Sequence, residues 1–318
     1  GVACSNVARW DGSAWNSLGA GTDALWLSDL LEYGGDLIAG GALVSGGGSC
    51  IGVGRWNEAA GTWQALGSGV NVAKRLILYD GELVAAGSFT AGDGTMYHGV
   101  ARWAGSAWQA LGPWAADAGS PNIEALAVYN GDLIAGGMFT SAAGVPCNNV
   151  ARWNAAAGAW QPLGAGIDGI VGALTVYRGE LIAAGAFATA GGTPCSSIAR
   201  WNGTAWQPLG AGTDGIVAAL AEYDGELIAG GYFTSAGGVA CNNIARWDGS
   251  TWRPLGAGIG SSGYSYVSAL GVHNGVLIVG GLFATADGAQ WIARWNGLTW
   301  QTLGLGMDNL PYALLSYQ

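Results

Sequence analysis

The stretch Ile244-Ala-Arg-Trp-Asp-Gly-Ser-Thr-Trp-Arg-Pro-Leu-Gly256 contains the pattern that decides the fold: an Arg-Trp pair, a short turn, a second Trp and a Leu-Gly pair. The motif occurs seven times in the 318 residues, and its first tryptophans are Trp10, Trp56, Trp103, Trp153, Trp201, Trp247 and Trp295. Successive copies are 46 to 50 residues apart. A period of this length is typical of β-propellers and related arrays, in which each repeat packs on its neighbours.

The fifth repeat shows four short strands most clearly. We expect them at Val217–Tyr223, Glu226–Phe233, Ile244–Trp247 and Trp252–Gly256. Asp224-Gly225 and Asp248-Gly249 are tight-turn signals, because glycine supplies a positive φ and aspartate or asparagine tolerates one. Four strands joined by hairpins make one propeller blade. The sequence therefore predicts an all-β, seven-bladed propeller of four-stranded blades, as a single domain over residues 1–318.

The strand types do not occur in equal numbers. The first, third and fourth strands occur seven times each, whereas a second strand is found only six times. The segment Tyr312–Gln318 resembles a first strand, and the segment Gly1–Trp10 leads into a third strand. We expect both ends to form one composite blade that closes the ring and lacks one strand. Trimming from a longer chain is the favoured explanation, since an unpaired strand edge inside a blade is a liability.

Several repeated residues have structural interpretations. In an antiparallel hairpin, the arginine that ends a third strand lies near the acid that starts a second strand, which predicts the pairs Asp36–Arg55, Glu82–Arg102, Asp132–Arg152, Glu180–Arg200 and Glu226–Arg246. Val276 in the sixth repeat leaves Arg294 without such a partner. The Gly-Gly pairs that end second strands open no helix, so a phosphate loop is disfavoured. Close packing under a tryptophan is the hypothesis for them.

The five cysteines occupy one repeat position, before the third strand: Cys4, Cys50, Cys147, Cys195 and Cys241. Equivalent points on neighbouring blades lie farther apart than the ~7 Å between Cα atoms that a disulfide spans. We therefore expect five unpaired thiols, and cysteine does not identify the compartment.

Composition excludes some partners. The formal net charge is −10 and the pI is about 4.4, whereas nucleic-acid binding needs a basic surface. No apolar run reaches the ~18 residues of a transmembrane helix, so membrane insertion is not expected. The chain has no initiator methionine and no signal-peptide pattern. It is interpreted as a mature or excised piece, part of a larger chain.

The segment Gly231-Tyr-Phe-Thr-Ser-Ala-Gly-Gly-Val-Ala-Cys-Asn-Asn-Ile-Ala-Arg-Trp247 combines a Gly-Gly strand end, Phe and Arg-Trp. This combination resembles kelch-type propellers, and more closely the repeats of the fungal cortical polarity-marker family and of propellers in bacterial surface proteins. The resemblance implies the scaffold, not the activity, because kelch-like folds serve both binding modules and galactose oxidase. The oxidase needs paired histidines and a Tyr–Cys cofactor, whereas this chain has only His98 and His273, in different repeat positions.

No Ser–His–Asp order, HExxH or CxxC motif is present. Departures from the repeat are therefore the better candidates for a ligand site. Two long loops enter the third and sixth first strands, at Gly112–Asn122 and Gly256–Tyr266. In an up-and-down blade the fourth-to-first and second-to-third loops share one face. The candidate ligand-binding residues on that face are Trp114, Asp117, Tyr264, Tyr266, Tyr97, His98 and Trp291. Local packing of these aromatic residues is the open alternative.

The same loops carry four aspartates in Gly-x-Gly-x-Asp patterns: Asp23, Asp168, Asp214 and Asp308. They are candidate ligands for a central cation, with turn capping as the favoured alternative. No cofactor is expected. The sequence predicts a non-enzymatic scaffold or interaction module, extracellular or on a cell surface, with a protein or glycan partner. The alternative is a carbohydrate-binding propeller that uses the aromatic loops.

Overall fold

The computed structural model describes residues 6–19, 26–44, 50–90, 96–115, 120–260, 263–285, 288, 290–307 and 309–317. Its contacts group into two compact units, residues 1–123 with 317–318 and residues 124–316. All regular structure in the described residues is β-strand, as predicted.

The first unit holds a two-stranded sheet, two four-stranded antiparallel sheets and one short strand. The two-stranded sheet pairs β1 (Ala8–Trp10) with β2 (Trp15–Ser17). The first four-stranded sheet comprises β3 (Trp26–Tyr33), β4 (Asp36–Val44), β5 (Cys50–Asn57) and β6 (Thr62–Ala65). The next comprises β7 (Val70–Tyr79), β8 (Glu82–Thr90), β9 (Met96–Trp103) and β10 (Trp108–Ala110), followed by β11 (Trp114–Ala115).

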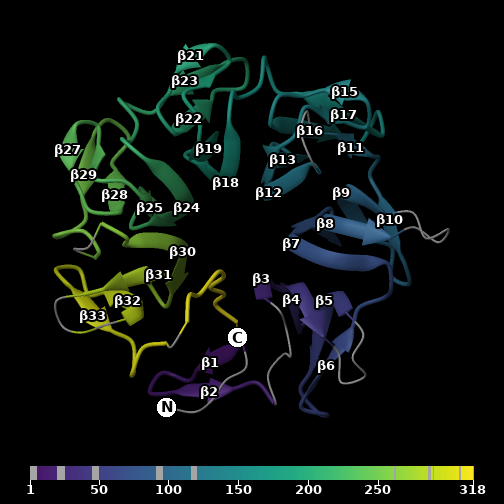
Figure 1. Ribbon diagram of the computed structural model, residues 1–318, viewed down its shortest axis with the longest axis horizontal. Coiled ribbons are helices and arrows are strands. Elements are labelled where there is room, and N and C mark those ends of the chain that lie inside the picture. Colours follow the sequence, from purple (N-terminus) through teal and green to yellow (C-terminus); the bar gives the residue numbers. More distant parts are fainter. Residues whose placement is uncertain are drawn as a thin grey trace. The chain divides into compact units, whose positions relative to one another are not determined.

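The second unit holds four four-stranded sheets, side by side in chain order (Figure 1). The first of them comprises β12 (Asn122–Tyr129), β13 (Asp132–Met138), β16 (Val150–Asn154) and β17 (Ala159–Pro162), and the second comprises β18 (Ile170–Tyr177), β19 (Glu180–Ala186), β22 (Ile198–Trp201) and β23 (Trp206–Pro208). The third comprises β24 (Ile216–Tyr223), β25 (Glu226–Tyr232), β28 (Ile244–Trp247) and β29 (Trp252–Pro254). The fourth comprises β30 (Tyr266–His273), β31 (Val276–Ala284), β32 (Gln290–Trp295) and β33 (Trp300–Thr302).

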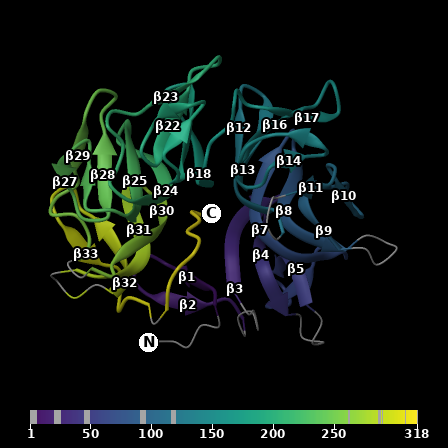
Figure 2. The same cartoon turned by 45° about the horizontal axis from the view of Figure 1, so that its top comes forward.

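In three of these sheets a short hairpin lies between the second and third strands. These hairpins are β14 (Ser141–Ala142) with β15 (Val145–Pro146), β20 (Thr189–Ala190) with β21 (Thr193–Pro194), and β26 (Ser235–Ala236) with β27 (Val239–Ala240). Figure 2 shows the sheets that begin with β24 and β30 next to each other, and their first strands are in contact. The buried second strands form the centre of each sheet: Leu227, Ile228 and Ala229 are all fully buried.

The two kinds of hairpin turn work differently. In the first-to-second turn both residues have positive φ, such as 54° at Asp224 and 71° at Gly225, which is the type I′ geometry. In the third-to-fourth turn only the glycine does, with φ of 104° at Gly249. There Oδ1 of Asp248 accepts hydrogen bonds from the backbone N–H groups of Ser250 and Thr251, each at 2.8 Å. The prediction that Asp248-Gly249 forms the same kind of tight turn as Asp224-Gly225 is therefore wrong. At Asp248 the aspartate side chain caps the turn instead.

Neighbouring sheets are joined by the tryptophans of the repeat. Nε1 of Trp252 donates to the carbonyl of Leu209, one repeat earlier, at 2.8 Å. The ring of Trp247 covers Gly210, where a Cβ atom would lie 2.9 Å from Cζ3 of that ring. The pattern recurs at other sheet boundaries: Trp206 donates to Leu163 and Trp108 to Leu66, while Trp201 covers Gly164 and Trp103 covers Gly67. At these three boundaries the Leu-Gly pair thus receives both tryptophans of the next repeat.

The Gly-Gly pairs have other neighbours than the predicted tryptophan. A Cβ on Gly230 would meet Val267 and Leu270 of the next first strand, and a Cβ on Gly231 would lie 2.1 Å from the carbonyl oxygen of Ile216. A β-bulge between Val217 and Ala219 in the paired first strand accompanies this contact. The first glycine therefore admits aliphatic side chains from the next sheet, and the second makes room for backbone beside the bulge.

All five predicted acid–arginine pairs are confirmed. The N–O distances are 2.6 Å for Asp36–Arg55, 3.6 Å for Glu82–Arg102 and Asp132–Arg152, and 3.2 Å for Glu180–Arg200 and Glu226–Arg246. The contact is diagonal, because Arg246 stands directly opposite Ile228 in the strand register. These pairs are partly solvated and serve register more than stability.

Three cysteine predictions can be compared with the structure. Cys147, Cys195 and Cys241 are free and buried, and burial raises the pKa of the Cys241 thiol to about 11. Cys4 and the side chain of Cys50 lie outside the described residues.

The first unit has a half-buried carboxylate between its two four-stranded sheets. Oδ2 of Asp29, on β3, accepts a 2.8 Å hydrogen bond from the backbone N–H of Leu76 on β7, and Oδ1 accepts one from Leu30. Burial raises the pKa of Asp29, and the neighbouring Arg75 opposes that shift. The residue is a link between first strands that the repeat pattern alone does not indicate.

The C-terminal segment differs from its prediction as a first strand. Residues 309–317 form no strand, although Ser268 on β30 donates to the carbonyl of Pro311 at 2.7 Å and a Cβ on Gly271 would lie 3.1 Å from Leu314. The segment therefore follows β30 where the next first strand is expected. A first strand forms its ladder with a second strand, and no described second strand pairs with these residues.

Replacing Trp252 by phenylalanine should remove the bond to Leu209 and lower the free energy of unfolding. Trp300 is the matched control, because its Nε1 atom is buried and has no hydrogen-bond partner among the described residues. We expect Trp252→Phe to cost about 1 kcal/mol more than Trp300→Phe, measured by urea unfolding. Equal losses would show that the indole N–H does not join the sheets.

Candidate functional site

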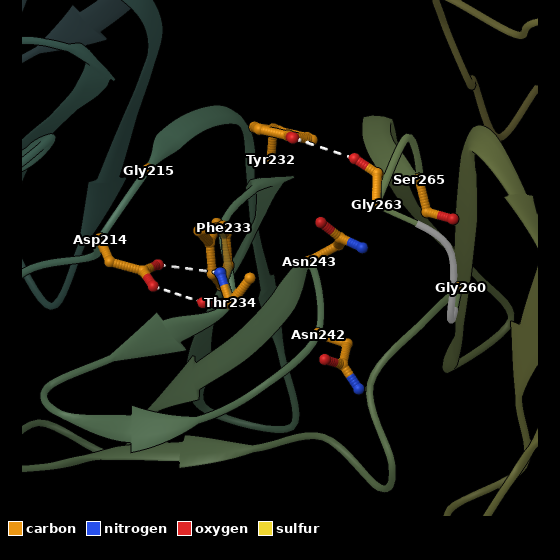
Figure 3. Close-up of a pocket in the computed structure, with 10 residues that line it drawn as sticks. All are labelled: Asp214, Gly215, Tyr232, Phe233, Thr234, Asn242, Asn243, Gly260, Gly263 and Ser265. Carbon is orange, nitrogen blue, oxygen red and sulfur yellow. Dashed lines mark hydrogen bonds between the residues drawn. The ribbon is translucent and has the colours of Figure 1, made fainter.

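A pocket of about 350 Å³ lies at the loops between the β24–β29 sheet and the β30–β33 sheet, wholly within the second unit (Figure 3). It is lined by Asp214, Gly215, Tyr232, Phe233, Thr234, Asn242, Asn243, Gly260, Gly263 and Ser265. The volume falls at the small end of the range for ligand sites. The lining mixes apolar surface with carboxylate, amide and hydroxyl groups, which is the composition of a polar recognition site.

One wall of the pocket is fixed by Asp214. Its Oδ1 atom accepts hydrogen bonds from the backbone N–H groups of Thr234 and Ser235, each at 2.8 Å. Its Oδ2 atom accepts the hydroxyl of Thr234. Asp214 therefore ties the loop before β24 to the hairpin that follows β25, and holds the hairpin in place as an aspartate cap.

Asp168 makes the same cap one repeat earlier. Its Oδ1 atom accepts hydrogen bonds from the backbone N–H groups of Ala188 and Thr189 at 3.0 and 2.9 Å. Turn capping, the favoured alternative to cation binding, is thus observed for both described aspartates. No group of three metal-ligating side chains occurs in the part of the chain that the structure describes. Asp23 and Asp308 lie outside that part.

The loop carboxylates are fully charged near neutral pH. Partial burial acts to raise the pKa of Asp214, but the hydrogen bonds from Thr234 and Ser235 outweigh it and leave the pKa below its usual value. The pKa of Asp168 is lowered in the same way, with burial opposed by bonds from Thr189 and Ala188. A general acid needs a raised pKa, so these two aspartates are suited to structure and to charge recognition rather than to proton donation.

Tyr232 forms the exposed rim. It is the last residue of β25, its surface is 53% exposed, and its hydroxyl donates to the carbonyl of Gly263 at 2.9 Å. Figure 3 shows this bond bridging the two sides of the pocket. The bond fixes the ring while leaving much of it open to solvent, so the ring can serve as a platform for a ligand.

Two asparagines form the floor. Nδ2 of Asn242 donates to the carbonyl of Ala257, and Nδ2 of Asn243 donates to the carbonyl of Ile259, both at 3.0 Å. Asn243 has a φ of 61°, a left-handed conformation that asparagine tolerates. These bonds connect the end of the β26–β27 hairpin with the loop before β30.

The predicted aromatic residues divide between the two units. Tyr264 lies beside the pocket, between the lining residues Gly263 and Ser265, and is 84% exposed. Tyr266 begins β30 and is half-buried. Trp291, on β32, is half-buried and has a φ of 66°. Of these three, the structure connects Tyr264 directly with the pocket through its chain neighbours.

The remaining candidates belong to the first unit. Trp114 is 7% exposed, and its ring lies against Gly99, where a Cβ would be 2.5 Å from the indole Cδ1. Trp114 is therefore packed against the protein, which agrees with the open alternative of local packing, and ligand binding by Trp114 stays a prediction. His98 pairs with Ser88 within the β8–β9 ladder. Asp117 and the side chain of Tyr97 lie outside the described residues.

His273 has both ring nitrogens engaged. Nε2 lies 3.0 Å from Asn274 Nδ2, and Nδ1 lies 2.8 Å from Ser316 Oγ. This arrangement fits the structural interpretation and holds the C-terminal segment beside β30.

Sequence reasoning missed the residues that line the pocket most directly. Asn242 and Asn243 repeat Asn148 and Asn149, so they were interpreted as repeat positions. Tyr232 carried a usable signal, because none of the equivalent residues is aromatic: Ala42, Ser88, Met138, Ala186 and Leu282. An aromatic departure beside a long loop is the feature that could have identified the site.

Two family models match parts of the chain. The C-terminal β-propeller domain of Rax2 matches residues 109–202, and a β-propeller domain of unknown function matches residues 224–247. Each match covers less than half of the chain. Together with the repeated four-stranded sheets, they support a β-propeller, a fold that suggests a protein-interaction module.

Solved structures of similar fold include a designed protein. It is the crystal structure of the computationally designed Ika8 protein, with 16% sequence identity, a TM-score of 0.51 and coverage of 92% of this chain and 91% of that one. Similarity at this identity concerns the fold alone. A comparison with curated proteins gives no match. Within the described residues, no helix has the length and apolar character needed to cross a membrane.

The cap at Asp214 should make stability depend on pH. Because its pKa is lowered in the folded state, its stabilising contribution is complete above the unfolded value of about 3.9 and is lost as the pH falls through the folded pKa. We expect Asp214→Asn to lose less stability than the wild type between about pH 5 and pH 2, measured by urea unfolding. Asp224→Asn is the control, because Asp224 acts through its backbone φ of 54°. An unchanged pH profile in Asp214→Asn would contradict the capping role.

Proposed function

We propose that this chain is a non-enzymatic interaction module that recognises a protein partner through the loop pocket between the fifth and sixth repeats. The observation that carries the proposal is that the carboxylates and the tyrosines of these loops have different roles. The carboxylates that could perform acid–base chemistry are committed to capping, whereas the aromatic side chains of Tyr232 and Tyr264 are 53% and 84% exposed. Fixed polar groups beside exposed tyrosines are typical of recognition surfaces.

We also propose that the protein acts outside the cell or at a cell surface. The resemblance of the repeats to surface-protein propellers supports this location. The net charge of −10 disfavours nucleic acid as a partner. A protein or a glycan remains the partner class, with no cofactor and with the chain acting as part of a larger one.

We also propose that the chain forms one closed, seven-bladed domain. Seven tryptophan pairs support it, because their ring centroids lie at a uniform 4.9 to 5.4 Å in every repeat. In this arrangement β1, β2 and the C-terminal segment share the composite seventh blade.

An X-ray structure of the chain should show seven sectors around one axis. The contact between tryptophans and a Leu-Gly pair recurs with the same geometry at three sheet boundaries, which is the physical reason to expect a single ring. A structure with six or eight sectors, or with an open array, would contradict the seven-bladed proposal.

A selection from a random peptide library displayed on phage tests the partner class. Peptides enriched on the wild-type chain should lose most of their binding in Tyr232→Ala and Tyr264→Ala, because truncating a central aromatic contact typically costs about 2 kcal/mol. Leu298→Ser is the control, since Leu298 is 78% exposed but lies in the third-to-fourth turn. If both tyrosine variants bind the selected peptides as tightly as the wild type does, the recognition site lies elsewhere.

The carbohydrate alternative is supported by the exposure of Tyr264. A glycan array measures it directly. Reproducible glycan binding that is lost in Tyr264→Ala would support the carbohydrate-binding propeller. If the phage selection also enriched no peptide, this function would replace the protein-partner proposal.

A further inference from the structure

The hydrogen-bonding inventory of the pocket indicates the chemistry of its ligand. The amide groups of Asn242 and Asn243 have a fixed orientation, because their Nδ2 atoms donate to backbone carbonyl groups that can only accept. Their Oδ1 atoms consequently face away from these carbonyls. In the view of Figure 3 both oxygens lie on the side toward Asp214.

Two of the hydroxyl groups at the pocket donate within the protein. The Tyr232 hydroxyl donates to Gly263, and the Thr234 hydroxyl donates to Asp214. The amide oxygens of Asn242 and Asn243 and the carboxylate of Asp214 can each accept a hydrogen bond from a ligand that is rich in N–H donors.

The charge of the pocket has one sign. Asp214 is the only charged residue among the described residues that line it, and its lowered pKa keeps it ionised at neutral pH. Oδ1 already accepts two N–H groups, whereas Oδ2 accepts one hydroxyl and retains a lone pair for a ligand. The whole chain is acidic as well, with a net charge of −10, which attracts a cationic partner.

We propose that the pocket binds the guanidinium group of an arginine side chain on the protein partner. A guanidinium offers five N–H donors and no acceptor, which complements Asp214 and the two asparagine oxygens. Its planar face stacks on an aromatic ring, and the Tyr232 ring stands at the rim for this contact. A lysine ammonium lacks the planar face and the fork of donors. The inference rests on the proposed function and names the partner group for that same site.

The experiment uses N-acetyl-L-arginine methylamide as the probe and follows backbone amide shifts of the ¹⁵N-labelled chain. We expect saturable shifts at pocket residues such as Gly215, Thr234 and Gly263, with a dissociation constant on the order of millimolar for a single side chain. N-acetyl-L-citrulline methylamide has nearly the same shape without the charge. It should bind at least about threefold more weakly, since exposed ion pairs contribute modestly.

The decisive variant is Asp214→Asn, in which the side-chain oxygen can still accept the bonds from Thr234 and Ser235 while the charge is removed. It should weaken arginine binding at least about threefold and bring it to the level of citrulline. Asp168→Asn is the matched control, because Asp168 makes the same cap without lining the pocket, and it should bind like the wild type.

Three outcomes would overturn the inference: equal shifts with the arginine and citrulline probes, equally tight binding of N-acetyl-L-lysine methylamide, or unchanged arginine binding in Asp214→Asn. These results would leave the proposed function separately testable. Peptides from the phage selection that depend on Tyr232 but contain no arginine would support the interaction module and reject the guanidinium.

Discussion

The packing of two tryptophans onto the Leu-Gly pair of the preceding repeat is the constraint on which the other features depend. The indole of Trp252 donates to Leu209, and Trp247 covers Gly210. Gly210 has a φ of 64° and no space for a Cβ atom, so glycine is required there for two independent reasons. This contact fixes the β24–β29 sheet against the β18–β23 sheet, and the ring of Trp295 lies against Gly256 in the same way at the boundary that borders the pocket.

The sequence was sufficient to predict features that depend on local spacing. The four-strand repeat, the first-to-second turns and the five acid–arginine pairs follow from residue order along a hairpin, and the structure agrees with them. Contacts between repeats were less accessible. Gly230 was expected under a tryptophan, but it faces Val267 and Leu270 of the next sheet. Hairpin periodicity determines which residues face the next sheet, but not which of its side chains meet them.

The candidate ligand site also depends on contacts that the sequence alone does not determine. Tyr264 was identified because its loop is longer than the others, and it does lie beside the pocket. Trp114, in another long loop, is instead buried against Gly99. Both residues are aromatic departures from the repeat, and sequence alone cannot distinguish a side chain that covers a glycine from one that faces solvent. Asn242 escaped notice for the opposite reason, since a residue that recurs in other repeats resembles a structural position.

Comparison of neighbouring repeats explains how a repeated frame produces one distinct pocket. Asp168 and Asp214 make the same cap on two backbone N–H groups, so the cap alone creates no site. What differs is the surroundings: Tyr232 stands where the fourth repeat has Ala186, and the following loop from Gly256 to Tyr266 is longer than that from Gly210 to Ile216. The Tyr232–Gly263 bond joins these two departures across the cap. Recognition chemistry therefore arises where two local changes meet on a frame that the tryptophans hold constant.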